Sequence, residues 1–236
     1  MNEQVVSSRM LTAEQAEELQ RAFVAKVYGW MMAGLMVTGI IALLTINTPA
    51  LLELVFSGRW TFLGLVFAQL GLVIWLSARV EKMSASTATI VFVAYSALTG
   101  LTLSAVFLLY TAASLATTFF VTAGTFGAMS AYGYVTKRDL TNMGSFLMMG
   151  LIGMILASVV NLFLNNETVY WITTYVGILI FVGLTAYDTQ KIKQMSVAAL
   201  QGEETEQKGA IMGALRLYLD FINLFLLLLR VMGSRK

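Results

Sequence analysis

Long apolar segments alternate with short polar segments along the whole 236-residue chain. Each apolar segment is close to the length of about 20 residues that a helix needs to cross the hydrocarbon core of a bilayer. The first connection contains the only proline, Pro49, directly after Asn47 and Thr48, a combination typical of a turn. The pattern predicts an all-α polytopic membrane protein with seven transmembrane helices at residues 27–44, 61–76, 87–110, 114–135, 142–164, 170–187 and 210–229.

Composition supports this class and removes several kinds of chemistry. Hydrophobic residues make up 58% of the chain and charged residues 12%, whereas soluble domains are about half apolar and a quarter charged. The sequence contains neither histidine nor cysteine, so it lacks the usual general base, the commonest metal ligand and any thiolate. We therefore expect a protein that is not an enzyme and has no cofactor. No basic patch typical of nucleic-acid binding is present.

Three segments are expected in the domain organisation. Residues 1–26 are rich in charge and lack the short apolar core of a signal peptide. Thr12 and Gln15 have the spacing of a capping box, which predicts a short amphipathic helix there, although a solvated lead-in segment fits equally well. Residues 27–230 form the predicted seven-helix transmembrane domain, and residues 231–236 form a basic carboxy-terminal tail.

The distribution of lysine and arginine predicts the orientation, because cytoplasmic segments carry an excess of positive charge. With seven spans, ten basic residues fall on the side of the amino terminus and four on the other side. The amino terminus is therefore predicted to be cytoplasmic and the carboxyl terminus to lie outside. If the last segment were re-entrant, both termini would be cytoplasmic. The ten are Arg9, Arg21, Lys26, Arg79, Lys82, Lys137, Arg138, Lys191, Lys193 and Lys208, and the four are Arg59, Arg230, Arg235 and Lys236.

A polar stripe runs along the last predicted helix. At about 100° per residue, Arg216, Asp220, Asn223 and Arg230 project within one arc, together with Leu227. Charges inside a span cost about 2.5 to 3.5 kcal/mol each on insertion scales, so they normally face the protein interior. We expect this helix to be enclosed by the others, with Leu227 as an apolar constriction beyond Asn223. The alternative is an ion pair between Arg216 and Asp220, one turn apart, that only helps the helix to insert.

Asp188 is the second candidate for chemistry. It lies at the end of the sixth span, within residues 183–191, and the predicted topology places it at the membrane face from which Asp220 also enters. The two carboxylates can therefore meet, and in a poorly hydrated site they would share one proton. When both are ionised, the pair repels itself or attracts a cation such as Ca²⁺. The alternative is that Asp188 is an interfacial residue beside Lys191.

Two motifs carry a family resemblance. Residues 183–191 (GLTAYDTQK) and 217–225 (LYLDFINLF) together resemble the Bax inhibitor-1 family, also called TMBIM, in its bacterial inner-membrane branch. The resemblance implies a central last helix surrounded by two three-helix layers and a pH-sensitive Ca²⁺ leak. The family's paired aspartates map onto Asp188 and Asp220. The basic residue that engages this pair in the family is matched most closely by Arg79, and Arg216 could serve instead.

Three functions remain open from the sequence. The leading hypothesis is a Ca²⁺ leak channel gated by protonation of Asp188 and Asp220, with the lipid bilayer and Ca²⁺ as its partners. A membrane interaction protein without transport activity, such as a modulator of a membrane protease or a stress response, is a different class and requires an unidentified membrane-protein partner. A proton-coupled transporter is the third possibility, because charged residues lie within the spans.

Overall fold

The computed structural model describes residues 13–196 and 202–236, and the expected capping residue Thr12 lies outside them. Seven of the described helices are long and apolar enough to cross a membrane, and no strand occurs in the described ranges. The spanning helices are α1 (Ala13–Asn47), α3 (Arg59–Arg79), α4 (Ala85–Leu109), α5 (Ala112–Val135), α6 (Thr141–Leu164), α7 (Glu167–Met195) and α8 (Glu203–Met232). The short helix α2 (Pro49–Phe56) and a 3₁₀ turn (Val80–Lys82) complete the order. The prediction of an all-α polytopic membrane fold is confirmed.

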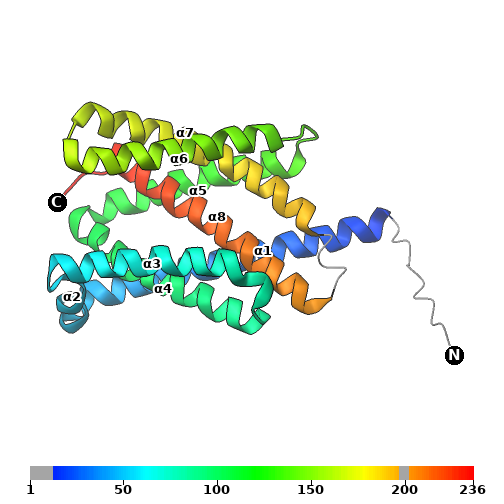
Figure 1. Ribbon diagram of the computed structural model, residues 1–236, viewed down its shortest axis with the longest axis horizontal. Coiled ribbons are helices and arrows are strands. Elements are labelled where there is room, and N and C mark those ends of the chain that lie inside the picture. Colours follow the sequence, from blue (N-terminus) through cyan, green and yellow to red (C-terminus); the bar gives the residue numbers. More distant parts are fainter. Residues whose placement is uncertain (1–12, 197–201) are drawn as a thin grey trace.

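Helix α8 lies at the centre of the bundle (Figure 1). It packs against α1, α4, α5 and α7, whereas α3 packs on α4 and α6 packs on α7. In the most apolar stretch of α8, 61% of the residues are buried, whereas no residue is buried in the corresponding stretch of α6. Helices α1, α3 and α4 therefore form one layer and α5, α6 and α7 the other, as the resemblance implied.

The two ends of α8 lie at opposite ends of the bundle (Figure 1). We call the end at which α8 begins the N-terminal end and the end at which it finishes the C-terminal end. With 30 residues, α8 is about 45 Å long, enough to cross a bilayer completely. Its length and its course from one end of the bundle to the other favour a complete crossing over the re-entrant alternative.

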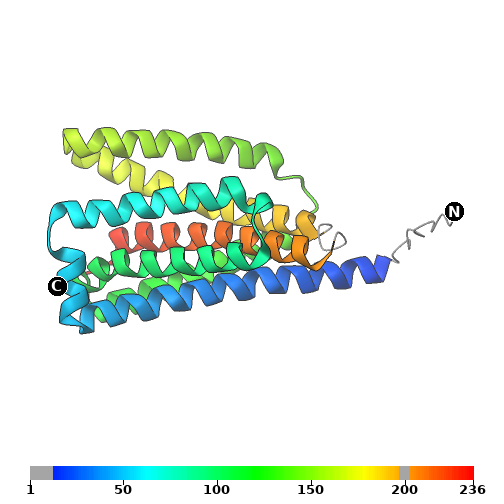
Figure 2. The ribbon, with the colours of Figure 1, turned by 60° about the horizontal axis from the view of Figure 1, so that its bottom comes forward.

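Helix α1 is longer than the apolar pattern predicted. It is one continuous helix of 35 residues, so the expected amphipathic helix and the first span are a single element, without a boundary at residue 26. Its first turns project beyond the N-terminal end of the bundle (Figure 2). A turn at Thr48 ends α1 as predicted, and Pro49 then starts α2, which the pattern did not predict. Proline suits a first helical position because its missing N–H would have no partner there.

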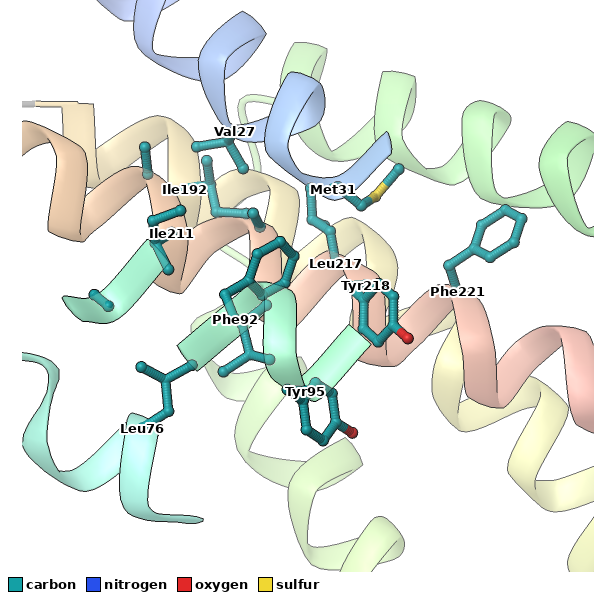
Figure 3. Packing of buried hydrophobic residues seen from close by; sticks show 14 of the residues in the cluster. Val27, Met31, Leu76, Phe92, Tyr95, Ile192, Ile211, Leu217, Tyr218 and Phe221 are labelled. Carbon is teal, nitrogen blue, oxygen red and sulfur yellow. The ribbon is translucent and has the colours of Figure 1, made fainter. Parts of the chain in front are cut away.

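A buried cluster at the N-terminal half joins α8 to the first layer. Tyr218 of α8 lies between Phe92 and Tyr95 of α4 (Figure 3), with each pair of ring centroids 5.9 Å apart and edge to face. The Tyr218 hydroxyl lies 2.7 Å from Thr38 Oγ1 of α1, and Thr38 Oγ1 in turn donates to the Ser96 carbonyl at 2.9 Å. Such packing and hydrogen bonds hold helices together where lipid removes the hydrophobic force between them.

The short carboxy-terminal tail lies against the connection between α4 and α5. An isolated antiparallel bridge joins Tyr110 and Arg235. The Thr111 N–H donates to the Ser234 carbonyl at 3.2 Å, and the Lys236 backbone N–H donates to the Leu109 carbonyl at 3.0 Å. The end of α8 is therefore attached to the segment that links the two layers.

Close approach of α5 and α6 to α7 depends on two glycines. A Cβ atom at Gly133 of α5 would overlap the carbonyl oxygen of Ala186 and come within 2.9 Å of its Cα and carbonyl carbon. A Cβ atom at Gly144 of α6 would overlap the Tyr187 ring. Both helices are thereby packed tightly on the segment of α7 that directly precedes Asp188.

Candidate functional site

Asp188 of α7 and Asp220 of α8 meet inside the bundle. Only 9% of the surface of Asp188 and 4% of that of Asp220 is exposed. Their carboxyl groups are close enough to act on each other electrostatically. Asp220 Oδ2 is buried and has no hydrogen-bond partner in the described chain. A protonated carboxyl group donates one hydrogen bond, whereas an ionised one only accepts, so a single proton on this pair would give the unpartnered oxygen a hydrogen bond.

Arg216 is the positive charge beside this pair. Its Nη1 atom lies 3.4 Å from Asp188 Oδ1, so the ion pair joins α8 to α7. The alternative of an ion pair between Arg216 and Asp220 within one helix is not observed, because Arg216 pairs with Asp188. When both carboxyl groups are ionised, the three side chains carry one net negative charge, which is costly to bury. One proton on the aspartates removes it.

Asp188 is buried within the bundle and is not exposed at its surface. Lys191 lies near enough to act on Asp188 electrostatically, but its Nζ atom donates to the Tyr187 hydroxyl at 3.2 Å. The Arg216 side chain is 37% exposed, so it connects the buried pair with the surroundings of the bundle.

The two residues after Asp188 fix this part of α7, and the sequence analysis did not identify them. The Thr189 hydroxyl lies 3.1 Å from the Tyr28 hydroxyl of α1. Buried Gln190 donates from Nε2 to the Arg138 carbonyl at 2.8 Å and accepts the Leu140 N–H at 2.9 Å. These bonds tie α7 to α1 and to the connection between α5 and α6. A polar pair next to an aspartate in an apolar helix was the signal available in the sequence.

Asn223 and Leu227 lie further along α8. Asn223 Nδ2 donates to the Leu219 carbonyl of its own helix at 2.8 Å. Leu227 is buried, and its Cδ1 atom lies 2.9 Å from the position of a Cβ atom at Gly177 of α7. It belongs to a buried apolar layer between α7 and α8, formed with Ile180, Phe181, Leu184 and Leu224. This layer separates the aspartates from the C-terminal end.

Arg79 does not reach the aspartate pair. It is the last residue of α3, its side chain is exposed, and within residues 13–196 and 202–236 it forms no hydrogen bond or ion pair. Helix α3 packs mainly on α4, on the outside of the first layer. The basic residue that the structure brings to the pair is Arg216.

Comparisons with known proteins identify the family of the chain. The chain matches the family described as "Inhibitor of apoptosis-promoting Bax1" over residues 20–236. It is 55% identical to inner membrane protein YbhL of Escherichia coli, over 92% of this chain and 93% of that protein. It is 47% identical to protein RP147 of Rickettsia prowazekii, over 93% and 92%, and 45% identical to a protein of Borreliella burgdorferi, over 96% and 98%. With its seven spanning helices and these matches along nearly its whole length, the chain belongs to the Bax inhibitor family of membrane proteins.

Proposed function

We propose that the protein is a pH-sensitive leak pathway for Ca²⁺ in the bacterial inner membrane, with its amino terminus in the cytoplasm. The observation that supports it most directly is the buried pair Asp188 and Asp220 with a single arginine beside it. The printed name of the Escherichia coli relative supports the inner membrane, and the excess of basic residues at the N-terminal end supports the orientation. We expect neither enzymatic activity nor a resident cofactor.

In the proposed closed state one proton is shared by Asp188 and Asp220 and holds α8 against α7. Loss of this proton leaves one net negative charge among Asp188, Asp220 and Arg216 in a site with little water. Like charges in such a site repel each other, and the site attracts a cation. Two carboxylates supply up to four of the six to eight oxygens that Ca²⁺ takes, so water completes its shell. Deprotonation therefore opens the contact between α7 and α8 and admits Ca²⁺.

Flux into vesicles tests this gate. Purified protein is reconstituted into vesicles that contain a Ca²⁺ dye, and the leak is measured from acidic to neutral pH. The leak should increase as the pH rises, and Asp220→Asn should remove the pH dependence because an amide cannot release the proton. Asp139→Asn changes an exposed carboxylate and serves as the control. An unchanged pH profile in Asp220→Asn contradicts the proposal.

The apolar layer around Leu227 is a second barrier in this pathway. Leu227→Ala removes part of the contact with Gly177 and should increase the leak at every pH without moving the midpoint of its pH dependence. Leu162→Ala is the matched control, because Leu162 lies on the exposed face of α6. If Leu227→Ala moves the midpoint, the apolar layer and the proton gate are not separate barriers.

A regulatory interaction protein is the second candidate, and the projecting start of α1 favours it (Figure 2). Leu19 is exposed there beside Glu18, outside the apolar stretch of the bundle. This function predicts no Ca²⁺ flux in purified vesicles and a membrane-protein partner that crosslinks to α1. A proton-coupled transporter, in contrast, would show counterflow of its substrate in the same vesicles.

A further inference from the structure

A polar cavity of about 350 Å³ lies at the C-terminal end of the bundle, between the α6–α7 connection and the last turn of α8. Its charged residues are Glu167 of α7 and Arg230 of α8. Arg230 follows Asp220 by ten residues, which corresponds to about 15 Å along the helix. The cavity is therefore separate from the aspartate pair.

One side of the cavity offers hydrogen-bond donors. The Arg230 guanidinium lies over the Tyr170 ring, with its carbon 5.4 Å from the ring centroid. Asn161 Oδ1 accepts the Asn166 N–H at 2.9 Å, and Asn166 Oδ1 accepts the Val169 N–H at 3.1 Å. Both amide oxygens are thus occupied, which leaves the amide nitrogens as donors without an acceptor in the described part of the chain. A guanidinium and amide donors around one space suit the oxygens of a phosphate.

Glu167 gives the same cavity a negative charge. Its Oε1 atom accepts a hydrogen bond from Trp171 Nε1 at 3.4 Å. Among the described residues, neither Glu167 nor Arg230 forms an ion pair, although both line the cavity. Two opposite charges that share a cavity without neutralising each other favour a ligand that carries both charges, because each charge then gains a partner.

The surroundings of the cavity identify the source of such a ligand. The end of α6 is apolar and exposed, with 75% of Leu162 and 83% of Phe163 accessible. Trp171 and Tyr175 stack on α7 with ring centroids 5.9 Å apart, and aromatic residues of this kind mark the headgroup level of a membrane. The cavity thus lies beside lipid-facing surface at the level of the headgroups.

We propose that this cavity binds the headgroup of a zwitterionic phospholipid with a primary ammonium group. Its phosphate lies against Arg230 and the amide groups of Asn161 and Asn166. Its ammonium group donates hydrogen bonds to Glu167, and its acyl chains lie along the apolar end of α6. The site does not depend on the proposed Ca²⁺ leak.

Native mass spectrometry of the full-length protein in detergent tests the site. Phosphatidylethanolamine and phosphatidylglycerol are titrated against the wild type, Arg230→Gln and Glu167→Gln. Arg230→Gln should weaken both lipids about tenfold, which is the effect of losing one charge-assisted hydrogen bond of about 1.4 kcal/mol. Glu167→Gln should weaken phosphatidylethanolamine alone and so remove its preference over phosphatidylglycerol.

Arg59→Gln is the matched control, because Arg59 lies at the same end of the bundle but outside the cavity. It should bind both lipids like the wild type. Equal affinity for phosphatidylethanolamine in all variants overturns the site. Glycerophosphoethanolamine, which has the headgroup without acyl chains, is added as a competitor. If it displaces the lipid at equal concentration, the ligand is a soluble zwitterion and the assignment to a membrane lipid is overturned.

Discussion

The close approach of α5 and α7 at Gly133 allows one substitution to be compared at two positions of one helix. Gly127 also lies on α5, and a Cβ atom there meets no atom within 4 Å. Gly127→Ala should therefore stabilise the protein by up to about 1 kcal/mol, the difference in helix propensity. At Gly133 the new Cβ atom meets the Ala186 backbone, which cannot rotate away, so the helices must separate. Overpacking of this kind costs about 1 to 3 kcal/mol.

The gain in helix propensity is common to both variants, so we expect Gly133→Ala to be less stable than Gly127→Ala by the overpacking cost of about 1 to 3 kcal/mol, a substantial part of a typical stability of about 5 to 15 kcal/mol. Unfolding in mixed micelles of a mild detergent and sodium dodecyl sulfate, followed by tryptophan fluorescence, measures both variants. Because Ala186 is two residues from Asp188, Gly133→Ala should also alter the pH profile of the Ca²⁺ leak. If the two variants were equally stable, the inferred contact between the backbones of α5 and α7 would be refuted.

Three further predictions concern polar contacts. Tyr218→Phe removes the hydrogen bond to Thr38 and should lower the free energy of unfolding by about 0.6 to 1.7 kcal/mol. A double-mutant cycle with Thr38→Val that shows no coupling energy would contradict this prediction. Gln190→Ala removes two hydrogen bonds to the α5–α6 connection and should lower the free energy of unfolding by about 1 to 3 kcal/mol in the same assay. An unchanged free energy of unfolding would mean that other contacts hold this connection. The Thr141 hydroxyl and N–H donate hydrogen bonds to Asp139 and lower the pKa of this carboxyl group below its usual 3.8. Ionised Asp139 therefore stabilises the folded protein above pH 3.8, and this stabilisation is lost as the pH falls through the lowered pKa. The thermal midpoints of the wild type and Asp139→Ala should therefore differ at neutral pH and converge in acid, and a difference that persists in acid would argue against this origin.

The apolar pattern predicted all seven spans, because a helix in lipid must be both long and apolar. It placed the start of the first span at residue 27, whereas α1 begins at Ala13. Backbone hydrogen bonds continue through the charged turns outside the membrane, so the change in polarity does not mark a change in structure. Helix α2 was missed because its eight residues are too few to establish a period.

The candidate site was predictable only in part. The stripe on the last helix indicated that Asp220 would be buried, because its cost in lipid is high. The ion pair of Arg216 with Asp188 was not predictable, because the spacing of residues along α8 indicates only which side chains of α8 are neighbours. It does not indicate which side chains of α7 lie next to them. Arg79 was matched to the family's basic residue only by its place near the end of the second helix. Because α3 lies on the outside of its layer, Arg79 is kept away from Asp188 and Asp220.

The central position of α8 has a consequence for biogenesis. In chain order α8 follows every other described helix, so the ribosome completes it after both layers have been synthesised. A helix that carries Arg216 and Asp220 partitions poorly into lipid by itself. The earlier helices provide polar contacts that α8 lacks in lipid alone, such as Asp188 for Arg216 and Thr38 for Tyr218, so α8 depends on both layers for its place in the membrane.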